Sequence, residues 1–331
     1  MDKFIESLEG EVAPGTIKKF NTLKKSLIDF TEANKRFNPL SFSMIDHSFK
    51  DGFVKHLRTQ APRGRQKRRP EGLQTGLLND TIGKYIESLK SFCKWAEERG
   101  YNQNQTYTKF KPISTGNRKR KAERRDIVTL TLDELTNFYQ HDFSKRPALE
   151  RVRDVFCFAA FTGQRWSDIE RFSKDDLKGD VWNFIAFKTK KRQEIDLTGF
   201  AAPALDILQK YKYQLPVISL QKFNDTLKDA GEAAGINTPV SIKRYSGVKE
   251  IETSEPKYYF MSSHMARRTC VSILLNNFGM APSLVMEITS HTDLKTLQKY
   301  LNTDRSARRE AMSRTKSVNE IMKVTHKKAA V

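Results

Sequence analysis

Six residues in the C-terminal half of the chain could act together on a phosphate ester. They are two arginines, a lysine, two histidines and a tyrosine: Arg165, Lys188, His264, Arg267, His291 and Tyr300. Fixed cations stabilise a phosphoryl group, imidazoles transfer protons, and a phenol can be a nucleophile. Because an ordinary tyrosine pKa is about 10, the phenol would need nearby cations to favour its anion. The set suits attack on a phosphodiester without a metal.

Taken singly, these residues are weak signals. Arg165 and Asp168 are three residues apart, as are His264 and Arg267, so on helices each pair would share one face. An arginine near a carboxylate is often only a surface ion pair. Lys188 lies in a run with further basic residues, and turn lysines are common. The order of the residue types along the chain is more specific than any one of them.

The N-terminal part must form helices if its apolar residues are to be buried. Apolar side chains recur every three or four positions over 17–30 and again over 49–57. A third helix is expected to begin at Asn79, as its N-cap, and to end at Gly100.

The C-terminal part is predicted to be helical around a small amount of β-structure. A capping-box pattern at Thr131–Glu134 begins a helix. Two β-like runs around a Lys- and Thr-rich turn predict a hairpin over 181–197, which contains Lys188. Further elements are expected as helices over 148–161 (ending at Gly163), 202–212 and 219–231, an extended segment over 239–260, and a helix from Ser263, as a cap, to Gly279.

The charge of the chain favours a polyanionic partner. Its 331 residues include 59 Lys and Arg against 39 Asp and Glu, a formal charge of +20. Nucleic acid is the first candidate, and an anionic membrane surface is a weaker one. No apolar run approaches a membrane span, and the acidic first residues do not resemble a signal peptide. With three distant, unpaired cysteines, a cytoplasmic protein with reduced thiols is expected.

Two basic segments are candidates for contact with phosphates. The segment 109–126 has eight basic residues, two acidic ones and no apolar periodicity, so we predict an interdomain linker that follows the phosphates. The second segment, residues 61–72, is predicted to be a mobile loop because proline and glycine interrupt it. The candidate DNA-binding residues are Lys109, Lys111, Arg118, Lys119, Arg120, Lys121, Arg124, Arg125, Arg65, Lys67, Arg68 and Arg69.

The ordered set resembles the tyrosine recombinase (phage integrase) family. The pattern is an arginine after a helix that ends in Thr-Gly, a hairpin lysine, His-x-x-Arg, and a His and a Tyr nine residues apart. The strings TGQRWSDI and SSHMARRTC are closest to integrases of Bacteroidetes mobile elements. The resemblance implies a mainly α fold with a small β-hairpin or sheet (α+β): a helical, SAM-like core-binding domain over 1–108, the linker 109–126, and a catalytic domain with a C-terminal tail over 127–331.

The resemblance also implies roles for the cations. Arg165 and Arg267 would hold the non-bridging oxygens of the scissile phosphate through paired guanidinium donors. Lys188 would be the general acid that protonates the departing 5′ oxygen. Lys190 is the alternative, because the register of the turn cannot be fixed from the sequence.

The remaining residues complete the implied site. His264 would assist proton transfer, His291 would hydrogen-bond a phosphate oxygen, and Tyr300 would attack phosphorus to give a 3′-phosphotyrosyl link. Asp168 would orient the catalytic residues without contacting the phosphate itself. The family needs neither a metal nor a cofactor. Its implied partner is double-stranded DNA, on which the family forms a homotetramer in a synaptic complex. Free in solution, we expect the protein to be a monomer. We expect it in the bacterial cytoplasm, associated with the nucleoid when it is bound to DNA.

Three features depart from the family pattern. Ser290 precedes His291 where most members have glycine, and a serine there could cap a helix. Asp196 stands where a proline is common, which we expect to be neutral. Many relatives have an additional N-terminal arm-binding domain, and we do not expect the residues before Pro14 to form one.

Three other functions remain to be weighed. A catalytically silent DNA-binding protein of the same fold would not need the complete residue set. A general basic DNA- or RNA-binding module would be expected to interleave aromatic residues with its basic runs, and these runs contain none. A metal-dependent nuclease would need a carboxylate cluster, but Asp175 and Asp176 are better explained as a helix start.

Overall fold

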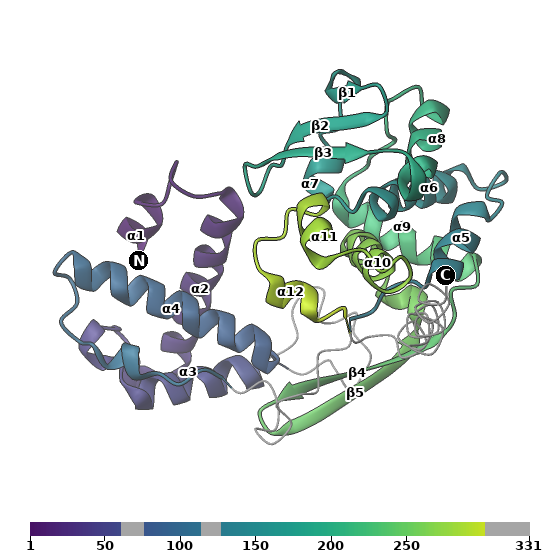
Figure 1. Cartoon of the computed structure of the whole chain (residues 1–331). Coiled ribbons are helices and arrows are strands. Elements are labelled where there is room, and N and C mark those ends of the chain that lie inside the picture. The colour runs from purple at the N-terminus through teal and green to yellow at the C-terminus, as the bar shows by residue number, and fades with distance from the viewer. Residues whose placement is uncertain (61–75, 114–126, 302–331) are drawn as a thin grey trace, which may run out of the picture. The chain divides into compact units, whose positions relative to one another are not determined.

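The computed structural model describes residues 1–60, 76–113 and 127–301 (Figure 1). The chain divides into two compact units. The first contains residues 1–123 and 242–253, and the second contains residues 124–241 and 254–331. All six candidate catalytic residues belong to the second unit. In the described residues, no helix is long and apolar enough to cross a membrane.

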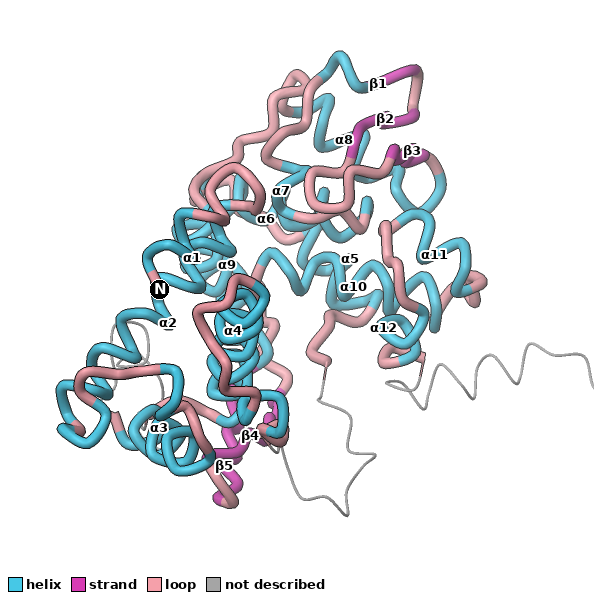
Figure 2. Tube along the Cα trace, turned by 90° about the vertical axis from the view of Figure 1, so that its left-hand side faces the viewer, coloured by secondary structure: helices cyan, strands magenta, loops and turns pink. Residues whose placement is uncertain are grey.

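The first unit is built from helices, which are cyan in Figure 2. They are α1 (Asp2–Glu6), α2 (Pro14–Ala33), α3 (His47–Thr59) and α4 (Asn79–Glu98), with short 3-10 turns at Lys35–Phe37, Phe42–Met44 and Thr106–Lys109. Their apolar faces meet in one core that includes the fully buried Phe49, Phe53 and Leu89. The three helices expected here are confirmed, and the left-handed Gly100 follows the end of α4 as predicted.

The prediction that Asn79 caps α4 is wrong. The N-cap residue is Leu78, and Asn79 is the first helical residue. The Asn79 amide instead pairs with the main chain of Gly247: its Nδ2 donates to the Gly247 oxygen at 2.8 Å, and its Oδ1 accepts from the Gly247 nitrogen at 2.8 Å. The side chain therefore hydrogen-bonds the main chain of a turn far along the sequence and not the first turn of its own helix.

The second unit surrounds helix α6 (Pro147–Thr162), whose residues from Val152 to Thr162 are all buried. Neighbouring helices pack against it because its second half, residues 155–161, is apolar on every side. These neighbours are α5 (Leu132–Gln140), α8 (Ala202–Lys210), α9 (Leu220–Ala233) and α10 (Ser263–Asn276). The other described helices of the unit are α7 (Trp166–Ile169), α11 (Pro282–Ile288) and α12 (Leu294–Gln298). Short 3-10 turns lie at Lys174–Asp176, Gly199–Ala201 and Lys257–Phe260.

The chain also forms two small sheets, and most of the sheet over residues 239–256 belongs to the first unit, which contains residues 242–253. Strands β1 (Leu177–Lys178), β2 (Val181–Ile185) and β3 (Arg192–Asp196) form an antiparallel sheet in that order. Trp182 pairs with Ile195 in it, and both side chains are buried. Strands β4 (Pro239–Ser246) and β5 (Lys249–Pro256) form the other sheet. The predicted hairpin over 181–197 and the extended segment over 239–260 are therefore confirmed.

Helix boundaries in the second unit follow local side-chain chemistry. Thr131 and Glu134 form the predicted capping box, and Glu134 also pairs with the buried ammonium of Lys257 at 2.6 Å. The left-handed Gly163 ends α6 as expected. Helix α10 differs from the prediction, because Ser262 rather than Ser263 precedes it and neither side chain caps it.

Candidate active site

Arg267 connects three segments of the second unit. Its guanidinium lies on α10, is 3% exposed, and donates from Nη1 to the carbonyl oxygen of Gly163 at 2.9 Å. Nη2 donates to the carbonyl oxygen of Thr289, which follows α11. The end of α6, the middle of α10 and the end of α11 therefore meet at one buried cation.

Arg165 lies beside this junction as the N-cap residue of α7. Its Nη2 donates to the carbonyl oxygen of Ser290 at 3.2 Å, while the buried Nη1 has no hydrogen-bond partner among the described residues. A buried charged donor without a partner is costly. The spare donor therefore favours an anion such as a phosphate oxygen.

The electrostatics of the two arginines point the same way. Burial lowers the pKa of Arg267, and the nearby charge of Arg165 lowers it further. Burial also lowers the pKa of Arg165, while Asp168 opposes that change. A buried and a half-buried guanidinium group that repel each other would be stabilised by a negative ligand between them.

Gly163 allows this packing because a larger residue would not fit. Its φ is +69°, and a Cβ atom there would lie 2.9 Å from the Cys270 sulfur and 3.1 Å from the Thr289 Cγ2. The neighbouring Gln164 donates from Nε2 to the carbonyl oxygen of Ile288 at 2.8 Å. This turn is therefore fastened to both α10 and the end of α11.

His291 contacts this pair of arginines. Its Nδ1 lies 2.6 Å from the Thr289 hydroxyl, and Arg267 Nη2 lies 3.4 Å from Nδ1 and 3.5 Å from Nε2. Burial lowers the pKa of His291 to about 4, with further contributions from Arg267, Arg165 and His264. The imidazole is therefore neutral at pH 7 in the DNA-free protein.

His264 lies in the first turn of α10; part of its surface is open to solvent, while protein atoms surround the rest of the side chain. Loss of solvent around the ring lowers its pKa to about 4, followed by the charges of Arg268 and Arg267 and, to a smaller extent, Arg165 and Lys188. The structure therefore gathers His264 with the arginines and with the hairpin lysine.

The two candidate lysines of the β2–β3 turn have different surroundings. Asp168 Oδ1 accepts a hydrogen bond from the Phe187 nitrogen at 2.7 Å, which ties the turn to α7. The ammonium of Lys190 lies over the Phe187 ring, 4.6 Å from its centroid, and Lys190 has a φ of +56°. Lys188 is exposed. Asp168 thus contacts the hairpin and is not ion-paired with Arg165 within 4 Å in the described part of the chain.

Tyr300 lies just beyond α12 and is 6% exposed. Its ring packs in an apolar cluster with Val271, Leu274 and Leu297. Burial raises the phenol pKa, and the charges of Arg268 and Arg267 and a hydrogen bond with Arg268 oppose that rise. The expected lowering by cations is therefore outweighed, and the hydroxyl is protonated in this state.

Sequence patterns did not indicate several residues that hold the site together. Gln164 and Asn276 make side-chain hydrogen bonds to distant parts of the second unit, and the Thr289 hydroxyl contacts the nearby His291. Arg268 was also missed. Its spacing of four residues from His264 was the available signal, because residues four apart share one face of a helix.

The DNA-binding candidates are only partly described. Lys109 and Lys111 are exposed residues of the first unit. The other ten candidates, and the C-terminal tail, lie outside the described residues.

Ser290 does not cap a helix, contrary to the expectation. Asp293 caps α12 by accepting a hydrogen bond from the Lys295 nitrogen at 2.9 Å. Ser290 instead has a φ of +49°, and its buried hydroxyl has no hydrogen-bond partner among the described residues. A left-handed residue explains why glycine suits this position.

Metal-ligating groups are not gathered in the described ranges, where no cluster of three or more His, Cys, Asp or Glu side chains could hold an ion. Asp175 and Asp176 lie in the 3-10 turn that follows Ser173, as the helix-start interpretation implied. The three cysteines are free and buried.

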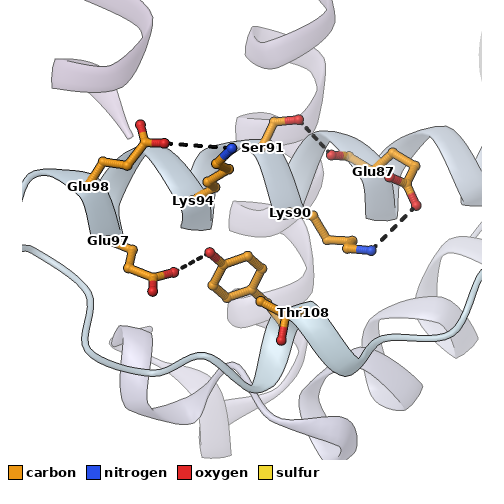
Figure 3. A pocket seen from close by; sticks show the side chains of 8 residues that line it. Glu87, Lys90, Ser91, Lys94, Glu97, Glu98 and Thr108 are labelled. Atoms are coloured by element: carbon orange, nitrogen blue, oxygen red, sulfur yellow. Dashed lines mark hydrogen bonds and ion pairs between the residues drawn. The ribbon is translucent and has the colours of Figure 1, made fainter.

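An open depression on α4 in the first unit is lined mainly by charged side chains (Figure 3). Lys90 pairs with Glu87 at 3.9 Å, and Lys94 pairs with Glu98 at 3.7 Å. The Tyr107 hydroxyl donates to Glu97. Because these charged groups pair with one another, the depression has, among the described residues, no unpaired buried donor like Arg165 Nη1 that would favour a ligand.

Comparison with known proteins agrees with this architecture. Tyrosine recombinase XerC from two strains of Neisseria meningitidis serogroup C is 25% identical over 232 residues, covering 70% of this chain and 71% of the relative. A lambda integrase dimer bound to a COC′ core site has a TM-score of 0.60 at 13% identity, covering 92% of this chain and 94% of that chain. XerH bound to palindromic difH has a TM-score of 0.58 at 15% identity, covering 90% and 79%.

Two family matches cover most of the sequence. Residues 1–112 match the phage integrase SAM-like domain, and residues 129–307 match the phage integrase family. The second match alone spans more than half of the chain. It includes all six candidate catalytic residues, from Arg165 to Tyr300. The chain therefore belongs to the phage integrase family of tyrosine recombinases, which cut and rejoin DNA at specific sites.

Proposed function

We propose that this recombinase integrates and excises a mobile DNA element through a 3′-phosphotyrosine intermediate at Tyr300. The observation that carries the catalytic part is the buried Arg267 beside the half-buried Arg165, whose buried Nη1 donor is left unpaired near His291 among the described residues. The mobile-element part is supported by the strings TGQRWSDI and SSHMARRTC.

Phosphate binding falls to the two arginines. Arg267 is fixed by the carbonyl groups of Gly163 and Thr289, and Arg165 by that of Ser290. Both groups are thus held before the substrate arrives, so little reorganisation is needed as charge develops on the phosphoryl oxygens. The phosphate would in turn offset the repulsion between the guanidinium groups.

Strand cleavage would then proceed by in-line displacement. The Tyr300 oxygen loses its proton, with the neutral imidazole of His264 as the acceptor, and forms a bond to phosphorus. The bond from phosphorus to the 5′ oxygen breaks, and Lys188 gives a proton to that leaving oxygen. Because a phosphodiester is exchanged for a phosphotyrosine, the partner strand's 5′ hydroxyl can reverse the step without ATP.

Lys188 is the better candidate for the general acid. Its charge contributes to the low pKa of His264, whereas the Lys190 ammonium is engaged by the Phe187 ring. Asp168 supports Lys188 indirectly, since it holds the turn that presents this lysine.

Duplex DNA is the proposed substrate, with the basic linker over 109–126 following its phosphates. Assembly as a homotetramer on two duplexes is proposed by analogy with lambda integrase, which has been seen as a tetramer bound to a Holliday junction. Action on DNA supports the expected bacterial cytoplasmic site. Neutralising Lys109 and Lys111 together should reduce the salt dependence of DNA binding by about two phosphate contacts.

A covalent-trapping assay tests the catalytic proposal. Nicked suicide duplexes from the flanks of the gene are labelled and incubated with wild type, Tyr300→Phe, Arg267→Ala and the control Tyr259→Phe. Wild type and the control should give a shifted band on a denaturing gel, with or without EDTA. Tyr300→Phe should give none, and Arg267→Ala should be slower by at least roughly 10²-fold.

The same gel separates the alternatives. A band that persists in Tyr300→Phe would exclude this nucleophile, and a band lost on adding EDTA would favour a metal-dependent nuclease. DNA binding without any covalent band from wild type would favour a catalytically silent binding protein.

A further inference from the structure

Thr289 has a side chain whose two contacts determine its hydrogen positions. The residue is fully buried, with no exposed surface. Its hydroxyl donates to the carbonyl oxygen of Val285, one turn back in α11, and also lies 2.6 Å from Nδ1 of His291. A carbonyl oxygen can only accept, so the single hydroxyl hydrogen is committed to Val285.

The contact with His291 must therefore run in the other direction. Since the Thr289 hydroxyl has no second hydrogen to give, the imidazole Nδ1 must carry a hydrogen and donate it. In the neutral ring only one nitrogen is protonated, so Nε2 is bare. The side chain of Thr289 thus selects one of the two tautomers.

Arg267 Nη2 also approaches the ring, at 3.4 Å from Nδ1 and 3.5 Å from Nε2, but the Thr289 contact with Nδ1 is much shorter at 2.6 Å and therefore sets the position of the hydrogen. The charged and titratable groups that affect His291 are Arg267 and His264 on α10 and Arg165 before α7. A guanidinium group has no acceptor and cannot take the Nδ1 hydrogen. Arg267 is also fixed by the main-chain oxygen of Thr289, so this one residue orients both the arginine and the histidine.

We propose that Thr289 is a positioning residue that binds Nδ1 of His291 and thereby commits Nε2 to the reacting phosphate. The inference rests on the proposed function of His291 at the scissile phosphate. A bound phosphate adds negative charge beside the two guanidinium groups, so it favours uptake of a proton at Nε2. The protonated ring then donates from Nδ1 to Thr289 and from Nε2 to a non-bridging oxygen.

Two substitutions separate the hydroxyl from the shape of the side chain. Thr289→Val keeps the volume and removes the hydroxyl, whereas Thr289→Ser keeps the hydroxyl. Nitrogen-15 spectra of the His291 ring in the DNA-free full-length protein should show the Nδ1–H tautomer in wild type and in Thr289→Ser. Thr289→Val should lose that preference. An unchanged tautomer in Thr289→Val would overturn the proposal.

Kinetics supply the second readout. At saturating suicide substrate, Thr289→Val should form the covalent adduct about tenfold more slowly than wild type, with unchanged DNA affinity, and Thr289→Ser should restore the rate. In a His291→Phe background, Thr289→Val should cost nothing further, because the histidine on which it acts is absent. An equal loss in both backgrounds would assign Thr289 a merely structural role.

Failure of the inference can be told apart from failure of the proposed function. If wild type forms no adduct at all, the proposed function fails while the spectra still report the tautomer. If wild type forms the adduct and Thr289→Val forms it at the same rate, only the inference about Thr289 fails.

Discussion

Asn276 and Tyr300 are joined by a hydrogen bond, in which Nδ2 of Asn276 donates to the carbonyl oxygen of Tyr300 at 3.3 Å. The same Nδ2 lies 3.1 Å from the Ser272 hydroxyl, one turn earlier in α10. Arg268, a further turn back, hydrogen-bonds the phenol. One face of α10 therefore holds both the main chain and the side chain of the proposed nucleophile.

Replacing Asn276 with leucine should release the main chain at Tyr300 and slow adduct formation by about tenfold, the effect of losing one hydrogen bond. DNA affinity should be unchanged, because Asn276 contacts no proposed phosphate ligand. Adduct rates and binding curves measure the two quantities separately. Ser272→Ala is the control, since it removes the other partner of Nδ2; an equal rate loss there would mean that the helix face, not the Tyr300 contact, is responsible.

Gly163→Ala should destabilise the second unit by about 2–4 kcal/mol. Roughly 1–2 kcal/mol comes from the left-handed backbone and the rest from contact with the Cys270 sulfur. Gly199→Ala is the matched control, because Gly199 has a φ of +55° but nothing within 4 Å of its Cβ position. Urea unfolding should show a clearly larger loss for Gly163→Ala, and equal losses would remove the packing explanation.

Ser290→Gly should stabilise the protein by about 1 kcal/mol, since glycine adopts the observed positive φ without strain. Ser290→Ala removes the unpaired buried hydroxyl but keeps the strained backbone. A shift in urea midpoint for Ser290→Gly that exceeds the shift for Ser290→Ala would identify the backbone as the source. If alanine stabilises as much as glycine, the hydroxyl is the source instead.

Acid should destabilise the folded second unit through His291. Its folded pKa is about 4, against an ordinary value of 6.5, so the unfolded state binds the proton first as the pH falls. The stability is fully present above pH 6.5 and is lost between pH 6.5 and 4. Urea midpoints measured across this window should fall less steeply in His291→Gln, and identical slopes for the two proteins would rule out His291 as the cause.

Asp168→Ala should slow strand cleavage while leaving DNA affinity unchanged. The substitution removes the acceptor that holds the Phe187 nitrogen and thus loosens the turn that carries Lys188. Asp168→Asn retains an oxygen at that position and should keep more of the rate. Single-turnover cleavage on suicide duplexes provides the comparison, and indistinguishable rates for the two variants would argue against a role for the turn contact.

Local patterns in the sequence were sufficient for most helices, the capping box at Thr131 and the hairpin around Lys188. Each is determined by residues close along the chain, where apolar spacing and capping side chains act directly. The order of arginine, lysine, histidine and tyrosine types also identified the family, because this chemistry needs those groups in any arrangement of the loops.

Tertiary structure decided how these residues act. The amide of Asn79 is indistinguishable in sequence from a helix cap, yet it binds Gly247, 168 residues away. Tyr300 stays protonated because burial outweighs the nearby cations, and burial depends on what the whole unit packs around the ring. The proposed tautomer of His291 follows from a hydroxyl whose only hydrogen is already committed to a helix carbonyl, and that arrangement arises only when the chain is packed.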